Sequence, residues 1–236
     1  RVMSKVFFNA NNNSFDTLSF ETNSSSASTF DPYVYFTTGS DRVSWDTGDG
    51  SGYQADNTLI YQYADSGTTK TVTMRIDKKD KLYRIDFALD NIVGNLDLSG
   101  FDGLTYLQLF VNSDLTGVTH TPSSKVFTYY SLGSGGMTGN HDVSMLTGLG
   151  GTFSMGASPN LTGITHTTST ETFTSYDVNG ANLIGVHDMS GLSGLGGNFY
   201  IYNNSNLTGI SHGVSTEVFT NYNAFSCGLV GNHDMS

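Results

Sequence analysis

A long stretch of this sequence occurs twice. HDVSMLTGLGGTFSMGASPNLTGITHT, which starts at His141, is matched by HDMSGLSGLGGNFYIYNNSNLTGISHG, which starts at His187. Repeats with periods of about 20 to 50 residues are typical of solenoids, in which each unit buries its apolar side against its neighbours. The duplication therefore predicts a stack of coils for this part of the chain.

Each unit of this duplication divides into two. The pattern apolar-x-apolar-x-x-small occurs seven times, ending at Asp90, Asn112, Gly135, Ser158, Ala181, Asn204 and Cys227. The five steps after Asn112 are equal, and the first step, from Asp90 to Asn112, is shorter by one position. We expect about seven coils of roughly 22–23 residues, within the usual range of solenoid repeats, each with one short strand such as Tyr106–Phe110 or Phe199–Tyr202. Connecting stretches such as THTTSTETFTSY lack helical periodicity, so almost no helix is expected after residue 80.

One copy, FDGLTYLQLFVNSDLTGV from Phe101, closely follows L-x-x-L-x-x-L-x-L-x-x-N. It resembles the leucine-rich repeat family, and Cys227 stands where that family accepts Asn or Cys. The resemblance covers roughly residues 80–236, and the paired units also look like surface-exposed repeats of bacteria and their phages. Leu107, Leu109, Leu115 and Val118 are expected to point into a continuous core.

Segment 1–77 lacks this period and reads as strands separated by polar turns, at residues 17–22, 33–38, 41–45, 58–63 and 70–76. The stretch VSWDTGDGSGYQADNTLIYQYADSGTTKTVTMRI resembles a PKD-type immunoglobulin-like domain, through Trp45, Asp46, Gly48, Asp49 and Gly50. We therefore predict an all-β protein: a small β-sandwich domain over residues 1–77, followed by a leucine-rich-repeat solenoid over residues 78–236.

Composition narrows the function classes. The net charge is −11, and all ten Lys and Arg residues lie at or before position 125, which argues against nucleic acid as a partner. The apolar runs are too short to insert into a membrane. A single Cys excludes an internal disulfide framework. A surface rich in Thr, Ser, Asn, Gly and Tyr favours an extracellular location, on a cell, on a virion or secreted.

Six histidines recur with the repeat, at His120, His141, His166, His187, His212 and His233. We expect them to share one position in the coil, with Leu96 at the aligned place in the first coil, and to form a half-buried ladder on the back of the solenoid. A catalytic centre would appear as one unrepeated cluster, so we predict no enzyme, no metal and no cofactor. The alternative is a metal bound by stacked imidazoles.

Asp46 and Asp49 offer a second metal candidate, a Ca²⁺ loop. The competing interpretation is a turn whose carboxylates accept hydrogen bonds from backbone amides, because the loop lacks the ligand spacing of an EF-hand.

Side chains alternate along a strand, so the residues flanking the inward apolar positions must point outward. On what we expect to be a concave face, these residues form a candidate binding surface: Tyr106, Gln108, Phe110, Asp177, Asn198, Tyr200, Tyr202, Asn221 and Asn223. Ser175, Asn179 and Phe225 accompany them. This surface contains neither Lys nor Arg, so it suits a neutral glycan or a polar protein patch. The alternative is that these side chains only form favourable cross-strand ladders.

The sequence thus predicts a non-enzymatic adhesion or receptor-binding module that recognises a cell-surface glycan or protein. The alternative is a structural repeat protein of a filament or virion that self-assembles through the solenoid end. The chain stops at Ser236 just after a histidine and without a polar cap, and from this we expect a cut or covered last coil.

Overall fold

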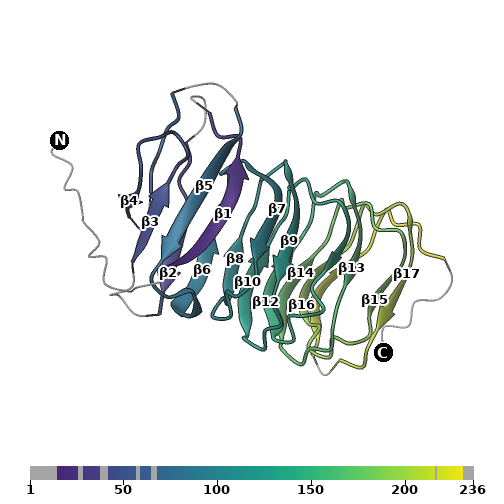
Figure 1. Ribbon diagram of the computed structural model, residues 1–236. Coiled ribbons are helices and arrows are strands. Elements are labelled where there is room, and N and C mark those ends of the chain that lie inside the picture. The colour runs from purple at the N-terminus through teal and green to yellow at the C-terminus, as the bar shows by residue number, and fades with distance from the viewer. Residues whose placement is uncertain are drawn as a thin grey trace.

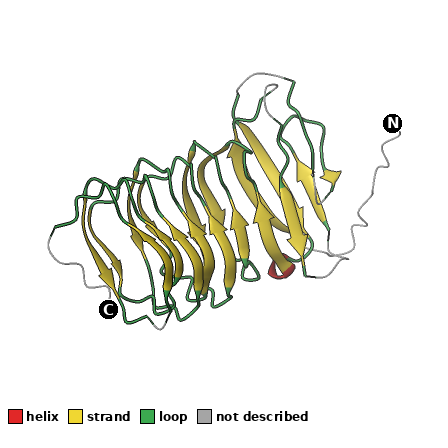
Figure 2. Ribbon diagram, turned by 180° about the vertical axis from the view of Figure 1, so that it is seen from behind, coloured by secondary structure: helices red, strands yellow, loops and turns green. Residues whose placement is uncertain are grey.

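The computed structural model of the chain describes residues 15–25, 29–37, 42–56, 59–64, 68–215 and 217–230. His233 and the end at Ser236 lie outside these ranges. The described chain is an all-β solenoid with a β-domain at its N-terminal end (Figure 1). Its one helical element is a 3-10 turn, Lys79–Lys81, which appears as the short red segment in Figure 2. No helix among the described residues is long and apolar enough to cross a membrane.

One eight-stranded sheet, here called the front sheet, runs the length of the molecule. Its last seven strands are parallel and come one from each coil, whereas β2 pairs antiparallel to β6 at the N-terminal end. The strands, in spatial order, are β2 (Tyr33–Phe36), β6 (Leu82–Asp86), β8 (Tyr106–Gln108), β10 (Phe127–Ser131), β12 (Leu149–Ser154), β14 (Phe173–Asp177), β16 (Gly197–Tyr200) and β18 (Phe219–Asn223).

A second strand of each coil lies on the opposite side, here called the back. These strands are β7 (Ile92–Leu98), β9 (Leu115–His120), β11 (Gly139–Asp142), β13 (Leu161–Thr165), β15 (Gly185–Met189) and β17 (Leu207–His212). The described residues therefore form six complete coils and the front strand of a seventh. The predicted repeat length is confirmed, because Leu107, Tyr130 and Phe153 lie side by side on successive front strands. The near absence of helix is confirmed as well.

The N-terminal strands extend both sides of the solenoid. On the back, β1 (Asp16–Thr22) pairs antiparallel with both β5 (Lys70–Ile76) and β7, and β3 (Val43–Asp46) and β4 (Gln54–Ala55) continue that sheet. The core is shared as well, because the rings of Trp45 and Phe20 pack on Phe87 of the first coil at 5.9 and 5.2 Å. The division into units 1–77 and 78–236 stays a prediction.

Four of the five predicted N-terminal strands are present, but segment 58–63 is not one. Its described part forms only an isolated bridge between Tyr61 and Phe30. The reason is local packing: the Tyr63 hydroxyl donates to the Thr47 carbonyl oxygen at 2.8 Å, and the ring of Tyr61 packs edge-on against Tyr63. The two aromatic residues cover the turn after Trp45 instead of extending the sheet.

The solenoid core confirms the predicted inward positions. Leu107, Leu109 and Leu115 are fully buried, and Val118 is nearly so. From the third coil on, one inward position of the front sheet alternates between Tyr and Phe: Tyr130, Phe153, Tyr176, Phe199 and Tyr222. Neighbouring rings in this series stack with centroids 4.9 to 5.5 Å apart.

Two of the residues that end the pattern, Asn204 and Asn112, bind the backbone of the turn with their side chains. The amide group of Asn204 donates to the carbonyls of Val178 and Ile201 at 3.0 and 2.7 Å, and its oxygen accepts from the Leu183 amide. Asn112 makes the same three kinds of bond near the other end of the solenoid. Since backbone groups at such buried turns need partners, these two side chains fix the turns of their coils.

Candidate binding surface and histidine clusters

The outward side chains of the front sheet form three straight rows across the coils, because the parallel strands stay in register. Row A contains Tyr35, Arg84, Tyr106, Tyr129, Thr152, Ser175, Asn198 and Asn221. Row B contains Tyr33, Asp86, Gln108, Ser131, Ser154, Asp177, Tyr200 and Asn223, of which Ser131 is buried. Row C, just beyond the strands, contains Phe110, Gly133, Gly156, Asn179, Tyr202 and Phe225.

All nine predicted binding residues lie in these rows. Each alternates with an inward residue as expected, for instance Phe199 between Asn198 and Tyr200. They fall into two groups, however. One group is on the second coil and the other on coils five to seven, so three strand spacings, or about 14 Å, separate them. The third and fourth coils between them carry mostly Ser, Thr and Gly in the rows.

Aromatic stacking marks both groups. At the N-terminal end, the guanidinium of Arg84 lies over the rings of Tyr106 and Tyr35 at 4.0 and 5.1 Å, and Tyr106 stacks on Tyr129 at 4.7 Å. At the other end, Tyr202 stacks on Phe225 with centroids 4.9 Å apart. Preformed stacks of this kind offer flat apolar faces beside hydrogen-bonding groups.

The expectation of a surface without Lys or Arg is wrong at one position, because Arg84 belongs to row A. Its charge is balanced locally, since its guanidinium donates to the Asp86 carboxylate at 2.8 Å. Desolvation by burial lowers the pKa of Arg84, but the bond to Asp86 and the charge interactions with Asp86, Tyr106 and Tyr35 together outweigh it, so the net shift is upward. Arg84 and Tyr129 could have been found by extending the repeat alignment one coil on either side of Tyr106. Tyr35 could not, because β2 is antiparallel and outside the repeat.

The amides of the C-terminal group are already hydrogen-bonded to one another. Asn221 donates from its amide nitrogen to the Asn198 side-chain oxygen at 2.6 Å along row A. In the second coil, the Tyr106 hydroxyl donates to Gln108 at 2.7 Å. These bonds hold the side chains in place and leave further donors and acceptors of the same groups facing outward.

The histidines are not at one position of the coil, which corrects the sequence interpretation. His141 and His187 are aligned with Leu96, Val118, Ile164 and Ile210. His120 and His212 are aligned with Leu98 and Met189, which lie further along the back strands. Successive histidines are alternately closer in the sequence, as from His120 to His141, and farther apart, as from His141 to His166. This alternation is the signal that the average period concealed.

Alternate residues of a strand lie on the same face, so both histidine positions point inward, and pairs of histidines meet one tyrosine from the front sheet. The Tyr130 hydroxyl lies 2.9 Å from Nε2 of His120 and 2.8 Å from Nε2 of His141. The Tyr176 hydroxyl lies 2.8 Å from Nε2 of His166 and 2.7 Å from Nε2 of His187. Because a hydroxyl carries one proton, it donates to one imidazole and accepts from the other.

The environment keeps these imidazoles neutral. His141 and His187 are 5% and 4% exposed. Burial lowers the pKa of each to about 4, although the neighbouring carboxylates Asp142 and Asp188 act in the opposite direction. Burial lowers the pKa of His120 to about 3 and that of His166 well below its usual value. Among the described residues, no three His, Cys, Asp or Glu side chains converge as metal ligands do.

The carboxylates of the candidate Ca²⁺ loop, Asp46 and Asp49, act as turn acceptors. Asp46 accepts from the Gly48 amide at 3.0 Å, and Asp49 accepts from the Ser51 amide at 2.9 Å. Asp49 also accepts from the hydroxyls of Thr47 and Tyr61. These hydrogen bonds outweigh burial and hold the pKa of Asp49 well below its ordinary value. The geometry is that of a capped turn.

No protein-family model, curated protein or solved structure matches the chain.

Proposed function

We propose that the chain is an extracellular, non-enzymatic binding module whose front sheet recognises a neutral glycan or a polar protein surface. In this proposal it is a leucine-rich-repeat-type solenoid preceded by a PKD-like β-domain. The observation that carries the proposal is the set of straight outward rows on the front sheet, with stacked aromatic rings at both ends and hydroxyl or amide groups between them.

The chemistry of the rows supports an uncharged ligand. Of the side chains in rows A to C, only Arg84, Asp86 and Asp177 are charged, and the first two form an ion pair. Tyrosine rings pack against the apolar faces of sugars, while amides and hydroxyls bond to sugar hydroxyls or peptide groups. Rows that run across the coils suit an extended ligand that lies across several of them.

The histidines support a non-enzymatic role. Four of them, His120, His141, His166 and His187, use Nε2 to bind a tyrosine hydroxyl, and burial depresses the pKa of each, so these four are occupied by the fold. The family assignment is supported by the Asn112 and Asn204 turns for the solenoid and by the Trp45 turn with its capped Asp residues for the β-domain. The lack of Lys and Arg after residue 125 supports an extracellular surface.

A glycan array followed by titration of the best ligand tests the proposal. The double variant Tyr200→Ala and Tyr202→Ala should weaken binding at least about 10-fold, since anchor aromatics each contribute more than about 1 kcal/mol. Tyr53→Ala is the matched control, because this half-exposed ring lies off the front sheet, against Arg75. Unchanged affinity in the double variant, with folding intact, would refute front-sheet recognition.

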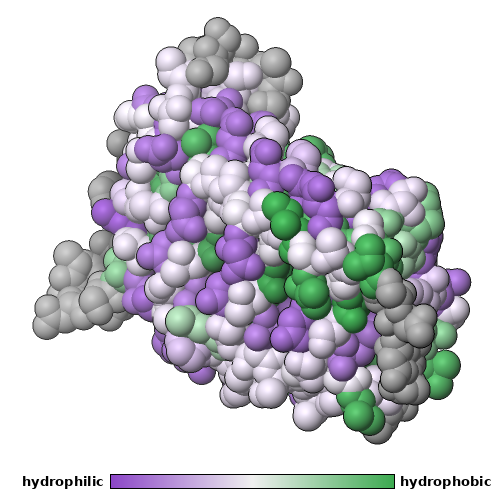
Figure 3. Space-filling view, turned by 90° about the vertical axis from the view of Figure 1, so that its right-hand side faces the viewer, coloured by the Kyte–Doolittle hydropathy of each residue, from purple (hydrophilic) through white to green (hydrophobic). Residues whose placement is uncertain are grey.

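A second candidate is assembly through the last coil. Viewed toward the C-terminal coils, hydrophobic residues gather on this face of the molecule (Figure 3). Val218, Phe225 and Val230 are exposed by 82%, 57% and 71%. A strand from a neighbouring molecule would pair with β18 as β16 does and cover them. Sedimentation velocity distinguishes the two candidates, since assembly predicts concentration-dependent growth that Val218→Ser reduces, and a concentration-independent monomer contradicts it.

A further inference from the structure

The front sheet is continuous, but the back is not. On the back, β9 and β11 belong to different sheets, and so do β13 and β15. We call the β9–β11 interruption the first seam and the β13–β15 interruption the second seam. The back strands are thus tied in pairs, β11 with β13 and β15 with β17, and each pair spans two coils.

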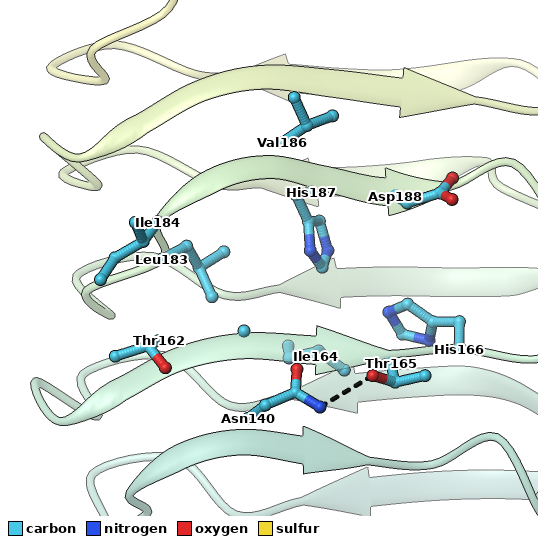
Figure 4. A pocket seen from close by; sticks show the side chains of 11 residues that line it. Asn140, Thr162, Ile164, Thr165, His166, Leu183, Ile184, Val186, His187 and Asp188 are labelled. Atoms are coloured by element: carbon cyan, nitrogen blue, oxygen red, sulfur yellow. Dashed lines mark hydrogen bonds between the residues drawn. The ribbon is translucent and has the colours of Figure 1, made fainter.

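Each seam is closed at its ends and open in the middle. At the second seam, the Ile184 amide donates to the Thr162 carbonyl at one end, and the Ser169 amide donates to the Gly191 carbonyl at the other. Between them lies a hollow of about 420 Å³ lined by both strands (Figure 4). The first seam has the corresponding bonds, from Thr138 to Thr116 and from Ser123 to Met145, around a hollow of about 300 Å³.

The histidine–tyrosine clusters cross these seams. His166 follows β13 and His187 lies in β15, so the two imidazoles come from opposite sides of the second seam, and both line its hollow. Both bond to Tyr176, which reaches them from β14 in the front sheet. His120, Tyr130 and His141 do the same at the first seam. Where the backbone ladder is missing, a side-chain cluster connects the two strands.

We propose that the two seams are acid-sensitive hinges: proton uptake by a seam histidine puts a charge in the buried cluster and removes the acceptor of the tyrosine hydroxyl proton, and the two-coil modules part at the back while the front sheet stays paired. In the neutral cluster the hydroxyl donates to one Nε2 and accepts from the other. When the accepting imidazole takes a proton, both imidazoles become donors and the hydroxyl proton loses its acceptor. If both are charged, two cations face each other with ring centroids 5.6 Å apart at the second seam.

The surrounding charges modify the effect of burial on the four histidines. Asp188 beside His187 favours the protonated form, whereas His212 opposes it, and His141 and His187 both oppose protonation of His166. At the first seam, Asp142 favours protonation of His141, and His141 opposes that of His120. At every one of these histidines burial has the largest effect on the pKa and lowers it. Acid therefore favours the open seam, in which the imidazole is exposed to water and can be protonated.

The expected change in the seam-opening equilibrium follows from the difference between the pKa of the histidine in the closed and open seam. With a pKa of about 4 for His187 in the closed seam and about 6.5 in water, the opening equilibrium rises about 30-fold per released histidine between pH 7.5 and pH 5. If the coils separate at the back while the front strands stay paired, the front sheet becomes concave at the position of the seam. The hinge is independent of what the front sheet binds.

Amide hydrogen exchange measured by mass spectrometry at pH 7.5 and pH 5, corrected for intrinsic rates, tests the hinge. We expect opening to increase about 30-fold or more in peptides that contain the amides bonded across the seams, those of Ser123, Thr138, Ser169 and Ile184, while peptides from β10, β12, β14 and β16 stay protected. Equal changes on front and back, or no change on either, would overturn the proposal.

A matched variant uses residues that the chain itself places at the aligned positions. Tyr176→Phe, His166→Leu and His187→Ile together copy Phe199, Leu98 and Ile210. This variant should abolish the acid response of the second seam and leave that of the first, which serves as internal control. If it does not fold, the same changes at Tyr130, His120 and His141 reverse the roles of the seams. Loss of both responses, or of neither, contradicts seam-specific hinges.

Discussion

Replacing Tyr176 with phenylalanine isolates the hydrogen bonds of the second cluster from its packing. Tyr176 is fully buried, and the ring at the next coil is already a phenylalanine, Phe199, stacked on it at 5.4 Å. The aromatic stack therefore accepts Phe at this position. The change removes one oxygen and leaves Nε2 of His166 and Nε2 of His187 without their partner. At about 1–3 kcal/mol for each orphaned buried group, we expect a loss of roughly 3 kcal/mol in unfolding free energy.

The triple variant that also carries His166→Leu and His187→Ile removes the orphaned groups. Its unfolding free energy should return to within about 1 kcal/mol of the parent, because replacing all polar partners by apolar groups of similar shape is nearly neutral. Urea unfolding and thermal melting at pH 7.5 measure both effects, and a loss of about 3 kcal/mol lowers Tm by about 6–12 °C in a chain of this size. A neutral single variant, or a triple variant no better than the single, would refute hydrogen-bonded clusters as the reason for these residues.

Three further predictions address other parts of the fold. Asn204→Ala removes three buried hydrogen bonds to the backbone and should lower the free energy of urea unfolding by about 3 kcal/mol. The control is Ser158→Ala, whose hydroxyl has no hydrogen-bond partner among the described residues and whose loss should cost under about 0.5 kcal/mol. The folded state depresses the pKa of His141 and His187 to about 4. Their contribution to the unfolding free energy is therefore complete above the unfolded pKa near 6.5 and falls by about 1.4 kcal/mol for each histidine at pH 5.5. Melting curves between pH 7.5 and 5.5 measure this loss. Asp49→Ala removes the acceptor of the Trp45 turn and should lower Tm by a few degrees; addition of Ca²⁺ should leave the parent's Tm unchanged, and an increase would indicate a Ca²⁺ site instead.

The coils could be predicted from the sequence because each one contains the same local pattern of apolar and small residues. Leu107 and Leu109 alternate with outward residues, and the pattern endpoint at Asn112 forms the predicted turn. The orientation of the front-sheet residues followed from the same alternation. What it recognises stays a prediction, since side-chain direction does not specify a ligand.

The clusters and seams could not be read in the same way. His166 and His187 belong to successive coils and meet only through Tyr176, which comes from the opposite side of the solenoid. The average repeat period hid their two positions. The missing ladder between β13 and β15 depends on how the backs of neighbouring coils separate, and no single residue marks it. The merging of the N-terminal strands with the solenoid depends on antiparallel pairing outside the repeat.

The alternation of Tyr and Phe along the core has a consequence for how such a chain can change its length. Deleting one coil, residues 141–163, would set Tyr130 beside Tyr176 and put Ile164 in the place of His141, so the Tyr130 hydroxyl would lose one of its two histidine partners. Adding or deleting two coils restores every contact. We therefore expect natural length variants of this chain to differ by pairs of coils and not by single coils, and a deletion of residues 141–186 to be more stable than a deletion of residues 141–163.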